Sequence, residues 1–155
     1  METNSLFNHV IYDDADGLYQ GREDAQGRKN GFGELFYTNG GHIQYRGLWK
    51  DDERNGLGTS FTQDGHIKAE GHWRNNSLSG WGTLYYNTSL VFKGHFVKNQ
   101  LSGHGIQLMD GQMVYEGQFE MGLRSGYGTE YYNTATKGQT IIYAGDWLKD
   151  HREHP

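Results

Sequence analysis

Three of the eight histidines are candidates for a metal site by their positions: His72, His95 and His104. Imidazole is a common metal ligand. His72 and His95 each directly follow a glycine and lie 23 residues apart, so successive β-hairpins would carry them on one face. Such positions are two strands apart, roughly 10 Å at about 4.8 Å per strand. One ion cannot bridge that distance without a sharp bend, and the sequence therefore predicts no metal site.

Three serines could serve as nucleophiles, namely Ser79, Ser102 and Ser125. A catalytic serine needs a histidine base and a group that orients this base. Each of these serines instead directly precedes a glycine pair of the form Gly-x-Gly. Recurrence at one position of a pattern indicates a structural role, in a turn or a cap.

Acidic clusters are the remaining candidates for chemistry. The run at 13–16 resembles part of a calcium loop, but Tyr12 stands where the first ligand belongs, and no flanking helices are evident. We interpret this run as a solvated turn and the acidic residues 51–53 as a solvated hairpin tip. The glycines alternate within strands instead of opening a helix, so no phosphate-binding loop is present. The sequence predicts no catalytic residue and no cofactor, and hence no enzyme.

The elements that position these side chains follow a repeated pattern of aromatic residues and glycines. In Tyr45-x-Gly47-x-Trp49 the three named residues lie on one face of an extended strand, and Gly56-x-Gly58 follows in the next strand. The leading glycine recurs as Gly21, Gly47, Gly71, Gly94, Gly117 and Gly145. The pairs are Gly31/Gly33, Gly56/Gly58, Gly80/Gly82, Gly103/Gly105 and Gly126/Gly128. The chain is therefore a repeat array.

This pattern resembles the MORN repeat (membrane occupation and recognition nexus). The resemblance covers the chain from about Phe7 to Trp147 and is clearest from Tyr45 to Gly65 and from Tyr115 to Tyr132. MORN repeats usually carry a glycine three residues after the second aromatic residue, and here only Gly122 keeps it. The equivalent places hold Asp52, Asn76, Asn99 and Asp150. Asn and Asp tolerate a positive φ best among non-glycine residues, so we expect a positive φ there.

The predicted fold is all-β: an elongated single-layer antiparallel meander of consecutive β-hairpins, a MORN-repeat solenoid of about twelve short strands. Residues 1–6 are predicted to be a loose N-terminus and 151–155 a polar tail. Residues 7–150 form a single array with an N-terminal half-repeat, five full repeats and a C-terminal half-repeat. Phe7 to Tyr12 is predicted to be a strand of the first half-repeat, and Asn133 to Gln139 a protruding, mobile loop.

Large side chains must substitute for the missing second layer of such a sheet. A glycine between two aromatic residues leaves a gap over which a ring from the adjacent strand can lie. An aromatic pair contributes about 0.5–1.5 kcal/mol beyond the area that it buries. Parity places a second set on the opposite face, consisting of Phe36, Phe61, Tyr85, Leu108 and Tyr131.

Composition limits the possible partners and the compartment. Hydrophobic residues make up 34% of the chain, aromatic residues 14%, and the formal net charge is −5. This acidic balance argues against nucleic acid and makes a membrane an unfavourable partner, because both attract clusters of Lys and Arg. The absence of cysteine excludes disulfides. We see no signal peptide and no apolar stretch near the ~20 residues of a membrane span, and we expect a cytoplasmic protein.

The leading functional hypothesis is a non-enzymatic protein–protein interaction scaffold. It would bind a partner peptide, helix or subunit through an aromatic groove or an end strand, as the resemblance to MORN proteins implies. The candidate partner-binding residues are Tyr45, Trp49, Trp73, Tyr85, Phe92, Phe96, Tyr115, Phe119, Tyr131, Tyr143 and Trp147. An unpaired edge at Tyr143 to Trp147 could also join two copies into a homodimer.

Two alternatives follow from the same resemblance. One is a module that binds phosphoinositides or membrane surfaces, as the family name suggests. The other is the targeting module of a larger methyltransferase- or kinase-type enzyme, with this chain as a fragment or as one of two subunits.

Overall fold

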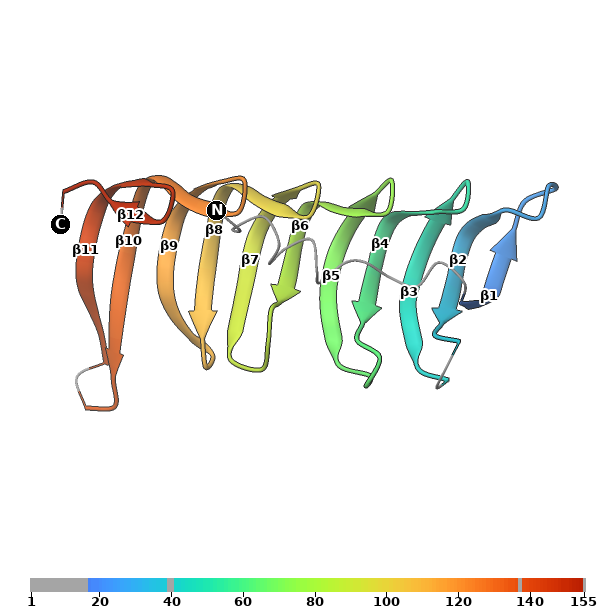
Figure 1. The fold of residues 1–155 in the computed structure, drawn as a ribbon, viewed down its shortest axis with the longest axis horizontal. Coiled ribbons are helices and arrows are strands. Elements are labelled where there is room, and N and C mark those ends of the chain that lie inside the picture. The colour runs from blue at the N-terminus through green and yellow to red at the C-terminus, as the bar shows by residue number, and fades with distance from the viewer. Residues whose placement is uncertain (1–16, 39–40, 137, 155) are drawn as a thin grey trace.

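The computed structural model of the chain describes residues 17–38, 41–136 and 138–154. All the regular structure in these ranges is β-strand, and twelve strands form one antiparallel sheet in which each strand pairs with its neighbours in sequence. Figure 1 shows the strands side by side in a single layer. This arrangement confirms the predicted meander. The strand predicted from Phe7 to Tyr12, the loose N-terminus and the acidic run at 13–16 lie outside the described residues.

The strands have similar lengths, except at the C-terminal end of the array. They are β1 (Leu18–Glu23), β2 (Lys29–Phe36), β3 (Ile43–Lys50), β4 (Glu53–Phe61), β5 (Ile67–Arg74), β6 (Ser77–Tyr85), β7 (Leu90–Val97), β8 (Gln100–Met109), β9 (Gln112–Glu120), β10 (Leu123–Thr134), β11 (Gly138–Leu148) and β12 (His151–Arg152).

One glycine from each of the first eleven strands lies in a single row across the sheet. Cross-strand pairing links Gly21, Gly33, Gly47, Gly58, Gly71, Gly82, Gly94, Gly105, Gly117, Gly128 and Gly145 in register. We call this the glycine row. The side of the sheet on which Tyr45 and Trp49 lie is the ring face, and the other side is the reverse face.

Tyrosine rings cover parts of the glycine row on the ring face. A Cβ atom at Gly58 would lie 2.0 Å from the Tyr45 hydroxyl oxygen, and one at Gly128 would lie 2.1 Å from that of Tyr115. Glycine is therefore required where a ring lies directly against the backbone of the next strand. The predicted seating of rings over glycines is confirmed where a tyrosine lies over the row, as at Gly58 and Gly128.

The first glycine of each Gly-x-Gly pair has a different role. Gly56 and Gly80 have φ values of 106° and 110°, a conformation that L side chains rarely adopt. Each lies where the register with the preceding strand shifts, at a β-bulge. These glycines are therefore needed for the backbone conformation and are not seats for rings.

Two-residue turns join the two strands of each hairpin. They confirm the expected positive φ at the positions where the family usually has glycine. Asp52, Asn76, Asn99 and Asp150 have φ values of 67°, 64°, 72° and 68°, and Gly122 has 81°. The preceding residue of each turn also has a positive φ, as type I′ turns require.

The side chains at these turn positions also tie neighbouring hairpins together. The Asn76 Oδ1 atom accepts a hydrogen bond from the Arg54 N–H at 2.9 Å, and its own N–H donates to the Arg54 carbonyl at 3.2 Å. Asp52, Asn99 and Asp150 accept in the same way from Lys29, Leu78 and Arg124. Gly122 has only the backbone bond, to the Leu101 carbonyl at 2.9 Å. The Asn and Asp residues thus add a link that glycine cannot make.

Three local expectations need correction. Residues 133–139 are mostly strand, since Asn133 pairs with Gln139 and Thr134 with Gly138, so a β10–β11 hairpin protrudes where a loop was predicted (Figure 1). The predicted polar tail contributes β12, which pairs with Trp147 and Leu148. The serines that precede the glycine pairs lie inside strands, and not in turns or caps as predicted. Each is part of a β-bulge in its strand.

Replacing a glycine that lies under a tyrosine ring should destabilise the array more than replacing a glycine of the same row that no tyrosine covers. We expect Gly58→Ala to lower the free energy of unfolding by about 1–3 kcal/mol, because the new Cβ must displace the Tyr45 ring. The matched control is Gly105→Ala, whose Cβ would meet its nearest atoms at 3.2 Å, with an expected cost below about 1 kcal/mol. Urea unfolding measures both, and equal losses would contradict this role.

The hydrogen bonds made by the turn side chains can be tested with a variant that should be more stable than wild type. Gly122→Asn should raise the free energy of unfolding by up to about 1 kcal/mol, because its side chain can accept from the Leu101 N–H at a φ that asparagine tolerates. Asn76→Gly should lower it by a similar amount. Gly122→Ala is the control: it introduces a Cβ without an acceptor and should destabilise. If Asn and Ala at this position behaved alike in urea unfolding, the link would contribute nothing.

Candidate interaction surfaces

The ring face holds most of the aromatic residues that the sequence identified, and it buries them. Eight of the eleven candidates are buried: Tyr45, Trp49, Trp73, Phe92, Phe96, Tyr115, Phe119 and Trp147. Their neighbours in the sheet contact them edge to face, as when Tyr45 packs between Trp49 at 5.0 Å and Trp73 at 5.4 Å. These rings are the core of the array.

The polar atoms of these rings have partners within the sheet. The Tyr45 hydroxyl donates to the Leu48 carbonyl at 3.1 Å, and Tyr19, Tyr115 and Tyr143 each donate to the carbonyl three residues further on. Trp49, Trp73 and Trp147 donate their indole N–H to a glycine carbonyl of the preceding hairpin. The same contacts recur from hairpin to hairpin, so they belong to the fold.

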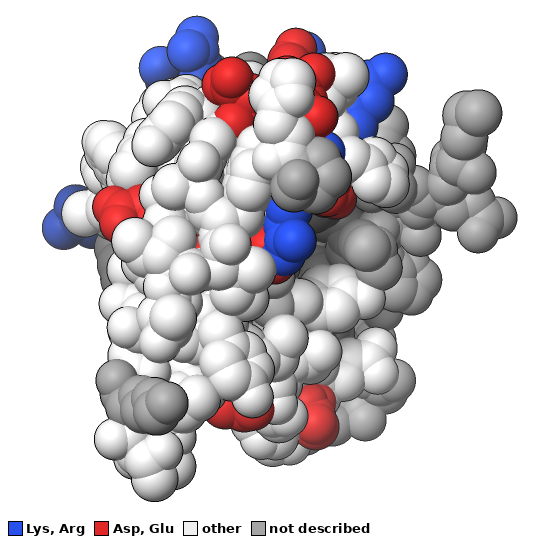
Figure 2. All heavy atoms as spheres, turned by 90° about the vertical axis from the view of Figure 1, so that its left-hand side faces the viewer, with Lys and Arg blue, Asp and Glu red and all other residues white. Residues whose placement is uncertain are grey.

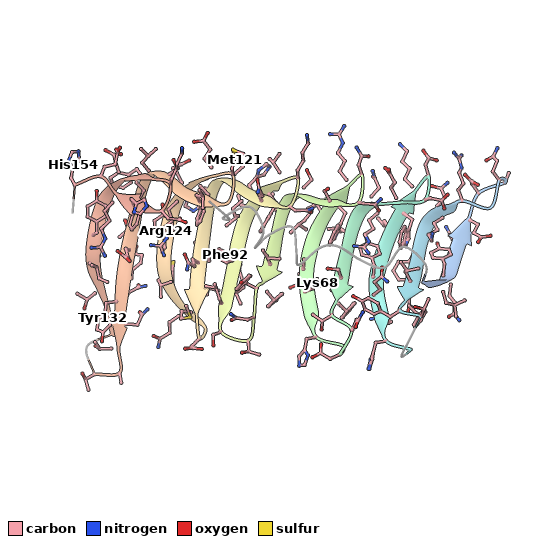
Figure 3. All side chains as sticks on the ribbon, in the orientation of Figure 1. Lys68, Phe92, Met121, Arg124, Tyr132 and His154 are labelled. Atoms are coloured by element: carbon pink, nitrogen blue, oxygen red, sulfur yellow. The ribbon has the colours of Figure 1, made fainter. Side chains whose placement is uncertain are left out.

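Cationic side chains complete the cover over the tyrosines. The Arg54 guanidinium lies 4.7 Å from the Tyr45 ring centroid, and that of Arg124 lies 4.4 Å from the Tyr115 ring centroid. Lys29 and Arg152 lie in the same way over Tyr19 and Tyr143. Figure 3 shows Arg124 over the strands of the sheet.

In two hairpins both the tyrosine and the cation that covers it are absent. Where the first ring position holds Ala69 or Phe92 in place of tyrosine, the covering residue is Leu78 or Leu101 in place of Lys or Arg. Leu78 and Leu101 are fully buried, and a Cβ at Gly82 would meet Leu78 at 3.1 Å. Leucine therefore fills part of the space that a tyrosine ring fills in the other hairpins.

Three of the predicted partner-binding residues are partly accessible. Tyr143 lies on the ring face at the C-terminal end, beneath Arg152. Tyr85 and Tyr131 lie on the reverse face, and the Tyr85 hydroxyl donates to the Glu70 carboxylate at 2.8 Å. The structure thus divides the predicted set between two faces and does not bring it together.

The reverse face carries an exposed row that the sequence reasoning missed. It contains the middle residue of each Gly-x-Gly and the residue that follows each leading glycine, paired as Phe32 with Leu48, Leu57 with His72, Trp81 with His95, His104 with Gln118, and Tyr127 with Asp146. We call this the Trp81 row. Its five large apolar side chains are between 40% and 62% exposed. The signal was present in the sequence, because these residues alternate with the glycines.

A second row runs along the other side of the glycine row on the reverse face. In order of strand it holds Gln20, Glu34, Arg46, Thr59, Glu70, Thr83, Lys93, Ile106, Glu116, Thr129 and Ala144. We call this the Glu70 row. Between the two rows lies a shallow hollow of about 460 Å³, whose lining includes Trp81, Lys93 and Ile106, with the glycine backbone as its floor.

The histidines do not form a metal site within the described residues, where no group of three or more His, Asp or Glu side chains could hold an ion. His72 and His95 share the Trp81 row but are separated by Trp81, which packs edge to face on His95 at 5.8 Å. The His104 Nε2 atom lies 3.4 Å from the Glu116 carboxylate.

The C-terminal edge is less open than predicted. β12 pairs with Trp147 and Leu148, and the Glu153 N–H donates to the Asp146 carbonyl at 3.0 Å, so part of the edge at Tyr143 to Trp147 is covered. Figure 2, which views this end, shows many charged side chains at the upper rim, a basic group near the centre and acidic groups at the lower rim, with uncharged surface between them.

The fold is thus a single-layer array of β-hairpins with two distinct faces, and the sequence comparison identifies its class. The family model described as MORN repeat matches residues 25–42, 45–67, 70–90, 92–112 and 115–136. The chain belongs to the MORN-repeat family. MORN repeats are generally protein- or membrane-interaction modules, and the proteins that contain them are typically non-enzymatic. A search of curated proteins finds no match to the sequence. None of the described residues forms a helix that could span a membrane.

Burial of the tyrosines makes the array sensitive to high pH. Burial raises the pKa of Tyr115 from the ordinary value of 10 to about 12, and it raises the pKa of Tyr45 as well. The folded state therefore keeps protons that the unfolded chain releases above pH 10. Their contribution to stability is full below pH 10 and is lost as the pH rises toward 12.

We expect the free energy of unfolding in urea to fall steeply between pH 10 and 12. The double variant Tyr45→Phe, Tyr115→Phe should show a shallower fall over the same range, because it cannot ionise at these positions. Tyr127→Phe is the control, since this side chain is 62% exposed. Equal slopes for the double variant and wild type would contradict the assignment.

Proposed function

We propose that this MORN-repeat chain is a non-enzymatic scaffold that binds a protein partner on the reverse face of its sheet. The observation that carries this proposal is the Trp81 row. It exposes Phe32, Leu48, Leu57, Trp81 and Tyr127 in one line along the array. Phe32, Leu48 and Leu57 lie on neighbouring strands, whereas His72 separates them from Trp81, and His95, His104 and Gln118 lie between Trp81 and Tyr127. Exposed apolar side chains gathered on one face among polar residues mark interaction sites on soluble proteins.

The difference between the two faces favours the reverse face, and not the ring face, as the binding surface. The ring face already packs its aromatic residues against glycines and cations, so it provides a rigid support. The reverse face instead has aromatic side chains with free area beside polar residues, the composition of interface hot spots. Tyr85 and Tyr131, two residues from the predicted partner-binding set, lie on this face and extend it.

The charges of the reverse face favour a protein over a lipid surface. Glu34, Arg46, Glu70, Lys93 and Glu116 mix both signs along the Glu70 row. Binding to anionic lipid headgroups relies on clustered Lys and Arg, which this row does not supply. The net charge of −5 acts in the same direction.

Affinity capture tests the proposal. We expect the variant Trp81→Glu, Tyr127→Glu to lose a captured protein partner by at least ~30-fold, since removal of a hot-spot residue costs about 2 kcal/mol or more. The control is Met121→Glu at a hairpin tip, because Met121 and Trp81 are both 61% exposed.

Two results would overturn the proposal. One is capture that is unchanged by the double variant while Trp73→Ala, shown to be folded by circular dichroism, abolishes it. The other is sedimentation with phosphoinositide-containing vesicles at physiological salt that depends on Trp81 and Tyr127, because it would assign the face to a membrane.

A further inference from the structure

We propose that the partner on the reverse face is a second copy of this chain, packed face to face about a two-fold axis that runs parallel to the strands, midway between the two sheets and over β6. This inference rests on the proposed function and names its partner. It is argued from the order of charges along the face, which is self-complementary about β6.

The proposed axis determines which strands meet. It reverses the order of the strands while keeping each row opposite its own copy. β5 of one copy then lies opposite β7 of the other, β4 opposite β8, β3 opposite β9, and β2 opposite β10. Packed sheets lie about 10 Å apart, close enough for the side chains of facing rows to meet.

The Glu70 row pairs opposite charges under this operation. Glu70 on β5 meets Lys93 on β7, and Arg46 on β3 meets Glu116 on β9. Thr83 on β6 meets its own copy at the axis. Within one chain, Arg46 lies 3.6 Å from Glu34 and Glu116 lies 3.4 Å from His104, whereas no ion pair involves Lys93 among the described residues.

Under the same operation the Trp81 row brings aromatic and imidazole groups together near the axis, and it sets Leu57 against His104 and Leu48 against Gln118 further out. Trp81 meets its own copy at the axis, and His72 meets His95 on either side of it. Phe32 meets Tyr127, which places apolar against aromatic side chains further out.

The other face-to-face arrangement leaves these charges without partners. A two-fold axis perpendicular to the strands would lay each row against the other row. Glu70 and Lys93 would then lie opposite His72 and His95, and Arg46 opposite Leu48. Burying charges without partners is costly, so the axis parallel to the strands is favoured.

The face is large enough for a stable dimer. Eleven strands at about 4.8 Å per strand give a length of roughly 50 Å, so a contact band about 16 Å wide would supply the roughly 800 Å² that a stable interface needs from each partner. Because sheets twist, two of them pack at an angle and separate toward their ends. The contacts nearest β6, Glu70 with Lys93 and Trp81 with its copy, should therefore contribute most.

An exchange of charges tests the geometry directly. We expect wild type to sediment as a dimer at about 100 μM. Lys93→Glu and Glu70→Lys should each raise the dissociation constant of the dimer at least ~10-fold, because each change places like charges opposite one another at two places in the dimer. An equimolar mixture of the two single variants should form a dimer with one copy of each. The double variant Glu70→Lys, Lys93→Glu should dimerise as wild type does.

The mixture also controls for folding, because a chain that had lost its structure could not be rescued by its counterpart. Glu70→Lys removes the acceptor of the Tyr85 hydroxyl, so Lys93→Glu is the cleaner single change. A wild type that stays monomeric would overturn the inference. So would a dimer that is indifferent to both single changes, as pairing through the edge of β11 would produce.

The two proposals fail separately. If wild type is monomeric while Trp81→Glu, Tyr127→Glu abolishes capture of a different protein, the second copy is wrong as the partner and the scaffold function stands. If neither self-association nor capture depends on Trp81 and Tyr127, both are overturned.

Discussion

The structure depends on close contact between large side chains and a continuous row of glycines. A sheet with one layer has no opposing layer to exclude water from its core face. Tyr45 and Tyr115 solve this by lying flat on the glycines of the next strand, so that the backbone itself is one wall of the core. A single methyl group on Gly58 or Gly128 would occupy the space of the ring. The glycines are therefore packing residues, although glycine usually weakens a strand.

The same constraint explains why substitutions between hairpins are coupled. Each tyrosine over the glycine row has a cation above it, and its hydroxyl donates to a carbonyl on its own strand. Where the array has Ala69, the neighbouring Leu78 moves into the vacant space over Gly82 and the cation is absent. Each hairpin thus has one of two complete solutions, tyrosine with Arg or Lys, or a shorter or apolar residue with leucine. The turn residues, such as Asn76, then link one hairpin to the next.

Because the ring face satisfies its own packing and hydrogen bonds, the two faces of the sheet differ in what they can do. The ring face contributes stability and a rigid support. The reverse face keeps Trp81 and Tyr127 in water, beside a row of alternating charge. Interaction follows from this asymmetry and needs no cleft.

The sequence by itself determined the repeat, the all-β meander and the positive φ at turn residues such as Asn76, because these depend on local spacing and local backbone preference. It also identified Tyr45 and Trp73 as important, but it could not say that they are buried. Tertiary structure decided that, because burial depends on Arg54 and on the glycines of the adjacent strand. It alone aligned Trp81 with residues from other hairpins. The register between strands, which sets these rows, depends on bulges whose position a strand's own sequence does not reveal.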